Sequence, residues 1–95
     1  MANTFTRSKK VDADINKITK WSLNKFGENQ TYKYIQEMNA SFQKIADNPE
    51  LGRPYLKYLC FRYESHVIYY RQRRNDIFIT RILHKKMLPE KHIKK

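Results

Sequence analysis

The residues best suited to chemistry are histidines and cationic side chains in the second half of the chain. His66, His84 and Lys85 could move a proton, and Arg71 and Arg81 could hold an anion. On a phosphodiester, a histidine or lysine would take the 2′-hydroxyl proton while arginines stabilise the phosphate. The same side chains could instead contact a protein partner or simply be solvated. Composition alone leaves these interpretations open.

Other catalytic and metal chemistries lack a supporting pattern. His66, His84 and His92 are the only histidines, and they form no His, Cys or carboxylate cluster at metal-ligand spacing. The only glycines are Gly27 and Gly52, so the chain has no glycine-rich phosphate loop. A serine-triad motif is also missing. We therefore expect neither a metal nor another cofactor.

Positive charge is concentrated in the second half of the chain. The formal net charge is +11. Residues 1–52 carry eight Lys or Arg against six Asp or Glu, whereas residues 53–95 carry twelve against three. Solubility alone does not require such asymmetry. The pattern predicts an acidic partner, which could be nucleic acid, an acidic protein or a phosphate-rich surface.

Size and composition favour a single folded domain, 1–95, in the cytoplasm. The apolar fraction is 40% and aromatic residues make up 14%, which is typical of a globular fold. No apolar run approaches the roughly 18 residues of a membrane span, and the N-terminus lacks the apolar region of a secretory signal. The one cysteine, Cys60, is interpreted as a small core residue in a strand, which suits a reducing compartment.

The first half predicts an antiparallel helical hairpin, about 9–48. Ser8 is a candidate N-cap, Gly27 a candidate C-cap for the first helix, and Asn48-Pro49 a stop for the second. Two apolar stripes at helical spacing predict its core: Val11, Ile15, Ile18, Trp21 and Phe26, then Tyr32, Ile35, Met38, Phe42 and Ile45.

The second half predicts a sheet, about 55–84, followed by a basic tail, 85–95. Three β-rich runs, 55–63, 66–72 and 76–84, are separated by short turns, as in antiparallel hairpins. Residues 3–7 could add a fourth strand. The predicted class is therefore α+β, with the hairpin packed on one face of a three- to four-stranded, mainly antiparallel sheet.

The last predicted strand is apolar on both of its alternating faces. Ile77, Ile79 and Leu83 would lie on one face, and Phe78 and Ile82 on the other. Such a strand belongs inside a sheet rather than at its edge. Because a hairpin covers only one face, we expect something else, such as a partner, to cover the second.

Four segments of the chain resemble the ParE branch of the ParE/RelE toxin superfamily. They are SHVIYYR at 65–71, RILHKKMLPEKH at 81–92, ADNPELGRP at 46–54 and FGENQ at 26–30. The string R-I-L-H-x-x-M-x-P-x-x-H is specific, because strand propensity does not produce it. The similarity extends from about Phe5 to His92.

The resemblance implies a bacterial toxin of a type II toxin–antitoxin pair, without a cofactor. A ParD-like antitoxin would neutralise it through an acidic C-terminal segment. ParE-like members inhibit DNA gyrase, so gyrase is the expected target, reached by protein–protein contact. Direct nucleic-acid binding is not expected except through that complex, and no membrane contact is expected. The alternative on the same fold is the RelE type, which cuts messenger RNA on the ribosome.

The nuclease reading matches the sequence only in part. RelE-type nucleases carry a mid-strand arginine, a second arginine after the last strand and a tyrosine near the C-terminus. The aligned positions are Val67, Lys85 and Lys91 or His92, so neither the mid-strand arginine nor the tyrosine is matched. If the chain is a ribonuclease, the candidate catalytic residues are His84, Lys85, Arg81 and His66. For the gyrase inhibitor, no catalytic residue is expected.

The candidates for target or antitoxin contact are the basic residues of the sheet and tail. Within the signature, Pro89 is predicted to fix a turn and Met87 to pack. Arg81 lies inside a strand and must find a carboxylate or carbonyl partner to be tolerated there. The full set of binding candidates is Arg62, Arg71, Arg73, Arg81, His84, Lys85, Lys86, Lys91 and His92.

Overall fold

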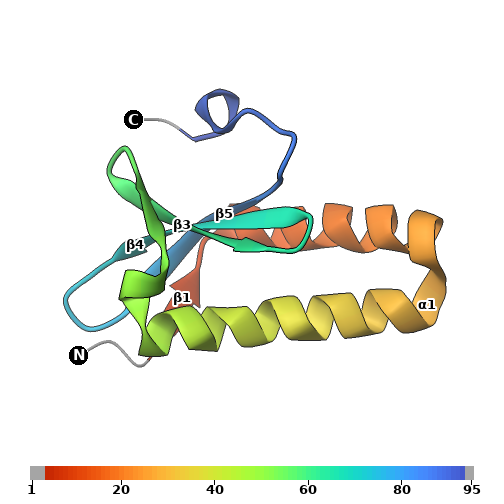
Figure 1. Cartoon of the computed structure of the whole chain (residues 1–95), viewed down its shortest axis with the longest axis horizontal. Coiled ribbons are helices and arrows are strands. Elements are labelled where there is room, and N and C mark those ends of the chain that lie inside the picture. Colours follow the sequence, from red (N-terminus) through yellow and green to blue (C-terminus); the bar gives the residue numbers. More distant parts are fainter. Residues whose placement is uncertain (1–3, 94–95) are drawn as a thin grey trace.

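A long kinked helix lies against one face of a five-stranded sheet, and the C-terminal segment lies on the other side (Figure 1). The computed structural model describes residues 4–93. The elements in order are β1 (Phe5–Arg7), α1 (Lys9–Asp47), η1 (Pro49–Leu51), β2 (Arg53–Tyr55), β3 (Tyr58–Tyr63), β4 (His66–Gln72), β5 (Ile77–His84) and η2 (Pro89–Lys91). The predicted α+β class is confirmed.

Helix α1 begins at the predicted cap. The Ser8 side chain accepts a hydrogen bond from the Val11 backbone N–H. The sequence predicts two separate helices, but the structure has one helix with a kink at Gly27, where φ is 83° and ψ is −177°. Only glycine adopts that conformation readily. The kink folds the two limbs alongside each other (Figure 1), and the buried Thr31 hydroxyl donates to Ser22 across them at 2.8 Å.

The core of α1 follows most of the predicted stripes, with two errors. Val11, Ile18, Met38, Phe42 and Ile45 are buried against the sheet. Two predicted core residues are not: Tyr32 is 67% exposed and Phe26 is 48% exposed. Both lie close to the kink, where the limbs extend past the sheet (Figure 1).

The sheet has the strand order β1-β5-β4-β3-β2. Strand β1 pairs parallel with β5, and the other pairs are antiparallel. The predicted count of three to four strands was too low. The predicted strand 55–63 is in fact two strands, because the chain turns at Leu56, whose φ is 55°.

A register shift in β5 changes which residues share a face. Tyr69 pairs with Arg81 but Tyr70 pairs with Ile79, so Thr80 is an extra residue between them. Ile77, Ile79 and Ile82 consequently all join the core under α1, whereas Leu83 packs on the opposite face. The grouping predicted by simple alternation was therefore wrong beyond Ile79. The prediction that this strand is not an edge strand is confirmed.

The C-terminal segment covers part of the second face. Ile93 is only 4% exposed and packs with Tyr58, Tyr69 and Leu83. The tail thus folds back on the sheet up to residue 93, instead of projecting as a free arm. In the described part of the chain, no helix has the length and hydropathy needed to cross a bilayer.

Candidate functional site

Rings from both helix limbs and the ends of two strands meet at one end of the molecule. Trp21 of the first limb contacts His66 and His84, with ring centroids 4.9 and 5.6 Å away. The two imidazoles are 5.2 Å apart. Tyr34 of the second limb lies 6.0 Å from Trp21 and 5.7 Å from His66. We call Trp21, Tyr34, His66 and His84 the ring cluster.

His66 is held in the neutral form inside the ring cluster. It is 3% exposed, and its Nδ1 lies 2.8 Å from the Tyr34 hydroxyl, which itself accepts from the Ser65 N–H at 3.1 Å. The hydroxyl proton is therefore free to donate to Nδ1, which leaves the imidazole proton on Nε2. Burial, with His84 nearby, lowers the pKa of His66 to about 4.

His84 is partly exposed and is also electrostatically biased toward its neutral form. Its Nδ1 accepts a hydrogen bond from the Lys86 backbone N–H at 3.1 Å. Partial burial lowers its pKa, and the positive charges of Lys86, Lys85 and Lys25 lower it further. A neutral imidazole at the rim of the ring cluster is the form that this arrangement favours.

Arg81 and Asp14 form an ion pair between the last strand and the first helical limb. Arg81 donates through Nε and Nη2 to the two Asp14 oxygens at 2.8 and 3.0 Å, and through Nη1 to the His92 carbonyl at 3.1 Å. Asp14, 5% exposed, also accepts the Ile82 backbone N–H at 3.0 Å. The predicted need of Arg81 for a partner is thus confirmed.

Ser8 and Asp14 cap a sheet edge that would otherwise be open. Strand β1 pairs only with Ile77–Ile79. Beyond it, the Ser8 hydroxyl donates to the Thr80 carbonyl at 2.8 Å, and Asp14 accepts the Ile82 backbone N–H. The start of α1 therefore takes the place of a strand beside β5 as far as Ile82, which protects that part of the edge from unwanted pairing.

A cleft of about 380 Å³ opens between the first limb and the end of β5. All three histidines of the chain line it. The complete lining is Asp14, Lys17, Ile18, Trp21, His66, Arg81, Ile82, Leu83, His84, Met87 and His92. Among residues 4–93, no three His, Cys, Asp or Glu side chains are placed to hold a metal ion.

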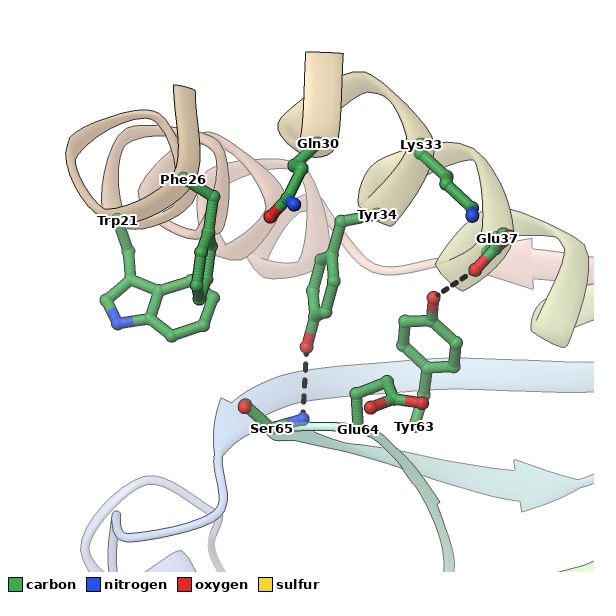
Figure 2. Close-up of a pocket in the computed structure, with 9 residues that line it drawn as sticks. All are labelled: Trp21, Phe26, Gln30, Lys33, Tyr34, Glu37, Tyr63, Glu64 and Ser65. Atoms are coloured by element: carbon green, nitrogen blue, oxygen red, sulfur yellow. Dashed lines mark hydrogen bonds between the residues drawn. The ribbon is translucent and has the colours of Figure 1, made fainter. Parts of the chain in front are cut away.

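A second cleft, of about 360 Å³, lies between the second limb and the β3–β4 turn. Figure 2 shows Trp21 and Phe26 on one side of Tyr34 and Tyr63 on the other. The Tyr63 hydroxyl donates to Glu37 at 2.9 Å. Nothing in the sequence analysis pointed to this cleft.

Comparison with known proteins shows which family the chain belongs to. The model of the ParE toxin of type II toxin-antitoxin system, parDE, matches residues 6–89. The chain belongs to the ParE toxin family. It is 30% identical over 93 residues to Toxin ParE1 of Caulobacter vibrioides (strain ATCC 19089 / CIP 103742 / CB 15), which covers 94% of this chain and 96% of that protein.

A solved structure supports the fold of this ParE-family chain. A chain of the chromosomal ParDE TA system from P. aeruginosa superposes with a TM-score of 0.77 at 18% sequence identity. The match covers 85% of this chain and 94% of that chain. At this identity the likeness concerns the fold.

The ParE-like signature splits into an interior and an exterior part. His66, Arg81, His84 and His92 line the first cleft together. Lys85, Lys86 and Lys91 are exposed. Pro89 begins η2, in keeping with its predicted role in a turn. Met87 was predicted to pack but is 38% exposed at the rim of the cleft, where it ends the turn that follows His84.

The predicted arginines of the sheet do not form one patch. Cross-strand partners share a face, so Arg62, opposite Val67, and Arg71, opposite Phe78, lie on the second face near its two ends. Arg62 donates to the Glu64 carbonyl. Arg73 is already paired with Asp76 at 2.6 Å and lies over the Phe78 ring.

Sequence reasoning missed Asp14, Lys17 and Tyr34 as parts of these sites, and assigned Trp21 to the helical core alone. One signal for Asp14 was present. It lies between Val11 and Ile18 at spacings of three and four, so a carboxylate occupies the buried stripe of the helix. A buried carboxylate requires a cationic partner, and Arg81 is the one in the last strand.

Proposed function

We propose that this ParE-family chain is a toxin that inhibits DNA gyrase by protein–protein contact and is neutralised by a ParD-like antitoxin. The observation that carries the proposal is the Asp14–Arg81 pair. Of the two strand arginines that could hold a phosphate, Arg81 is itself held by a carboxylate and a carbonyl. The other, Arg71, lies at the end of β4 away from the histidines. The family signature at this point therefore supports a fold rather than a reaction.

The remaining nuclease candidates also fit catalysis poorly. His66 lines the first cleft but is only 3% exposed, and its Nδ1 is hydrogen-bonded to Tyr34, so it presents little surface to a phosphodiester. His84 has Nδ1 occupied by the Lys86 N–H. That leaves one ring nitrogen of His84 and the exposed Lys85 as groups that could meet an RNA. A general acid, a general base and a free phosphate clamp are not assembled together.

The exterior part of the signature instead suits contact with another protein. Met87 and Leu88 are exposed apolar residues, 38% and 51% accessible, beside the exposed ammonium groups of Lys85, Lys86 and Lys91. Adjacent exposed apolar side chains with a charged rim are typical of an interaction surface. We call residues 85–91 the signature loop and propose that it contacts the gyrase complex.

The antitoxin would bind the second face of the sheet. Ile93 covers only part of that face, where Tyr55, Cys60 and Val67 stay half-buried around it. An acidic amphipathic segment would bury apolar side chains there and place carboxylates opposite Arg62 and Arg71. Charge would speed the association and fix the register, while apolar burial would supply most of the affinity.

A paired assay tests the target. Purified toxin is added to a gyrase supercoiling reaction and, separately, to translating ribosomes with labelled message. We expect loss of supercoiling, with gyrase held on cleaved DNA, and intact message. Addition of the antitoxin should restore supercoiling. Message cut at codon-spaced positions with supercoiling untouched would replace the gyrase proposal by the RelE-type alternative.

Neutralising the signature loop should remove toxicity without unfolding the protein. The change is Lys85→Gln, Lys86→Gln and Lys91→Gln together. Exposed substitutions typically shift stability within about 0.5 kcal/mol each, so the urea midpoint should stay close to that of the parent. Growth arrest on induction and the urea midpoint are measured together.

The matched control removes three exposed cations elsewhere, at Lys9, Lys20 and Arg74. It changes net charge equally, so it should leave growth arrest intact if the loop acts by position. Equal loss of toxicity in both triple variants would assign the effect to overall charge. Loss of stability together with toxicity in the loop variant would make the loop structural.

A further inference from the structure

The second cleft combines aromatic walls with carboxylates, which is unusual on so basic a chain. Four rings line it, with Trp21 and Phe26 centroids 5.7 Å apart and Tyr34 and Tyr63 centroids 5.1 Å apart. Figure 2 shows Gln30 above the gap between Phe26 and Tyr34, with Ser65 and Glu64 at the opposite wall. The rings in each pair are tilted against one another, so the cleft is bordered by both ring faces and ring edges.

The cleft carries two carboxylates, although the chain as a whole is strongly basic. The chain has nine Asp or Glu residues and a net charge of +11. Glu37 and Glu64 line this cleft against one ammonium, that of Lys33. Both glutamates are exposed, and Glu37 accepts the Tyr63 hydroxyl within the cleft. Carboxylates beside ring faces are suited to a single cation, even on a protein whose overall charge is positive.

The two carboxylates contribute to the raised pKa values of the tyrosines in the cleft. Burial raises the pKa of Tyr63, and the hydrogen-bonded charge of Glu37 and the nearby charge of Glu64 raise it further. Burial also raises the pKa of Tyr34, with Glu64 contributing in the same direction. The neighbouring Lys25 ammonium already lies 5.7 Å from the Trp21 ring centroid. One cation of this chain thus already lies against the Trp21 ring.

We propose that this cleft binds one arginine side chain presented by a partner protein. A planar guanidinium stacks on ring faces while its N–H groups reach carboxylates, a combination that the compact, strongly hydrated ammonium of lysine matches less well. Lys25 and Lys33 flank the cleft. The two ammonium groups repel a second positive group, so polyamines are disfavoured. The preferred ligand is therefore a single arginine on an otherwise neutral peptide segment. This site is separate from the signature loop and does not require gyrase as the target.

Titration by ¹H–¹⁵N NMR tests the site, with the single tryptophan as reporter. The probe is the blocked peptide acetyl-Gly-Arg-Gly-amide at near-physiological salt, where the Debye length of about 8 Å screens the overall positive charge. We expect saturable shifts of the Trp21 indole N–H and the Ser65 amide. The same peptide with citrulline, which has nearly the same shape but no charge, should cause no saturable shift.

Variants and competing cations decide between outcomes. Glu37→Gln and Glu64→Gln should each weaken binding about tenfold, the equivalent of one charge-assisted contact. Glu28→Gln, an exposed glutamate outside the cleft, should leave the affinity unchanged. Equal shifts with the citrulline peptide, equal weakening by Glu28→Gln, or tighter binding of spermidine than of the arginine peptide would each overturn the proposal.

Discussion

Replacing Asp14 by alanine should lower the free energy of unfolding by about 3–5 kcal/mol, because it leaves a buried arginine without its counterion. The same change removes the acceptor of the Ile82 N–H, so the free part of the β5 edge loses its cap. A domain of this size has a total stability of about 5–15 kcal/mol. The variant should therefore be partly unfolded at growth temperature. Urea unfolding followed by Trp21 fluorescence measures the loss.

Asp12 provides the matched control for Asp14. It lies in the first turn of the same helix and pairs with Arg7 at 3.4 Å, with both side chains well exposed. Such pairs contribute about 0–1 kcal/mol, so Asp12→Ala should have little effect. The double variant Asp14→Leu with Arg81→Met should recover part of the loss, because no charge is left buried. Similar small losses for both alanine variants would mean that the buried pair does not hold α1 to β5.

Acidification should destabilise the protein through His66. The unfolded histidine binds a proton below its ordinary pKa of about 6.5, whereas the folded one stays neutral until about pH 4. The unfolded state therefore gains protons first, and stability present above pH 6.5 is lost as the pH falls to 4. At 1.36 kcal/mol per unit of pKa difference, His66 accounts for about 3 kcal/mol of this loss.

His66→Phe isolates this contribution. Phenylalanine keeps a ring against Trp21 but cannot titrate, and Tyr34 still accepts from the Ser65 N–H. Denaturant unfolding at pH 7 and pH 4.5 should show a smaller difference for the variant than for the parent. His84 has a lowered pKa as well, so some slope should persist. Parallel profiles for the two proteins would show that protonation of His66 does not drive the acid sensitivity.

Strand positions could be predicted from the sequence where typical turn residues flank the strand. The prediction failed where the turn is made by other residue types. The run 66–72 matches β4 because polar turn residues flank it. The turn at Leu56 has no Gly, Pro, Asn or Asp, although its φ of 55° is the kind that such residues normally supply. The sequence also gives no signal for the extra residue at Thr80, because a β-bulge is set by cross-strand pairing and not by composition.

For the first cleft and the ring cluster, the sequence indicated several of the residues involved but not how they are arranged. That Arg81 needs a partner follows from its place in an apolar strand, yet Asp14 lies 67 residues away along the chain. The ring cluster joins two limbs of a helix to two strand ends, so no local spacing encodes it. The turn at Pro89 was predicted from the sequence. The burial of Ile93 was not, because it depends on the second face that Tyr58, Tyr69 and Leu83 create.

The parallel pairing of β1 with β5 sets when the sheet can be completed during synthesis. Phe5 pairs with Ile77, so the first strand of the chain is completed by the last. Such distant contacts form late, because a long loop must close before they stabilise anything. A chain emerging from the ribosome cannot make the sheet, or the Asp14–Arg81 pair, until β5 has left the exit tunnel. Until then, α1 lacks the β5 surface on which Ile77, Ile79 and Ile82 join its core.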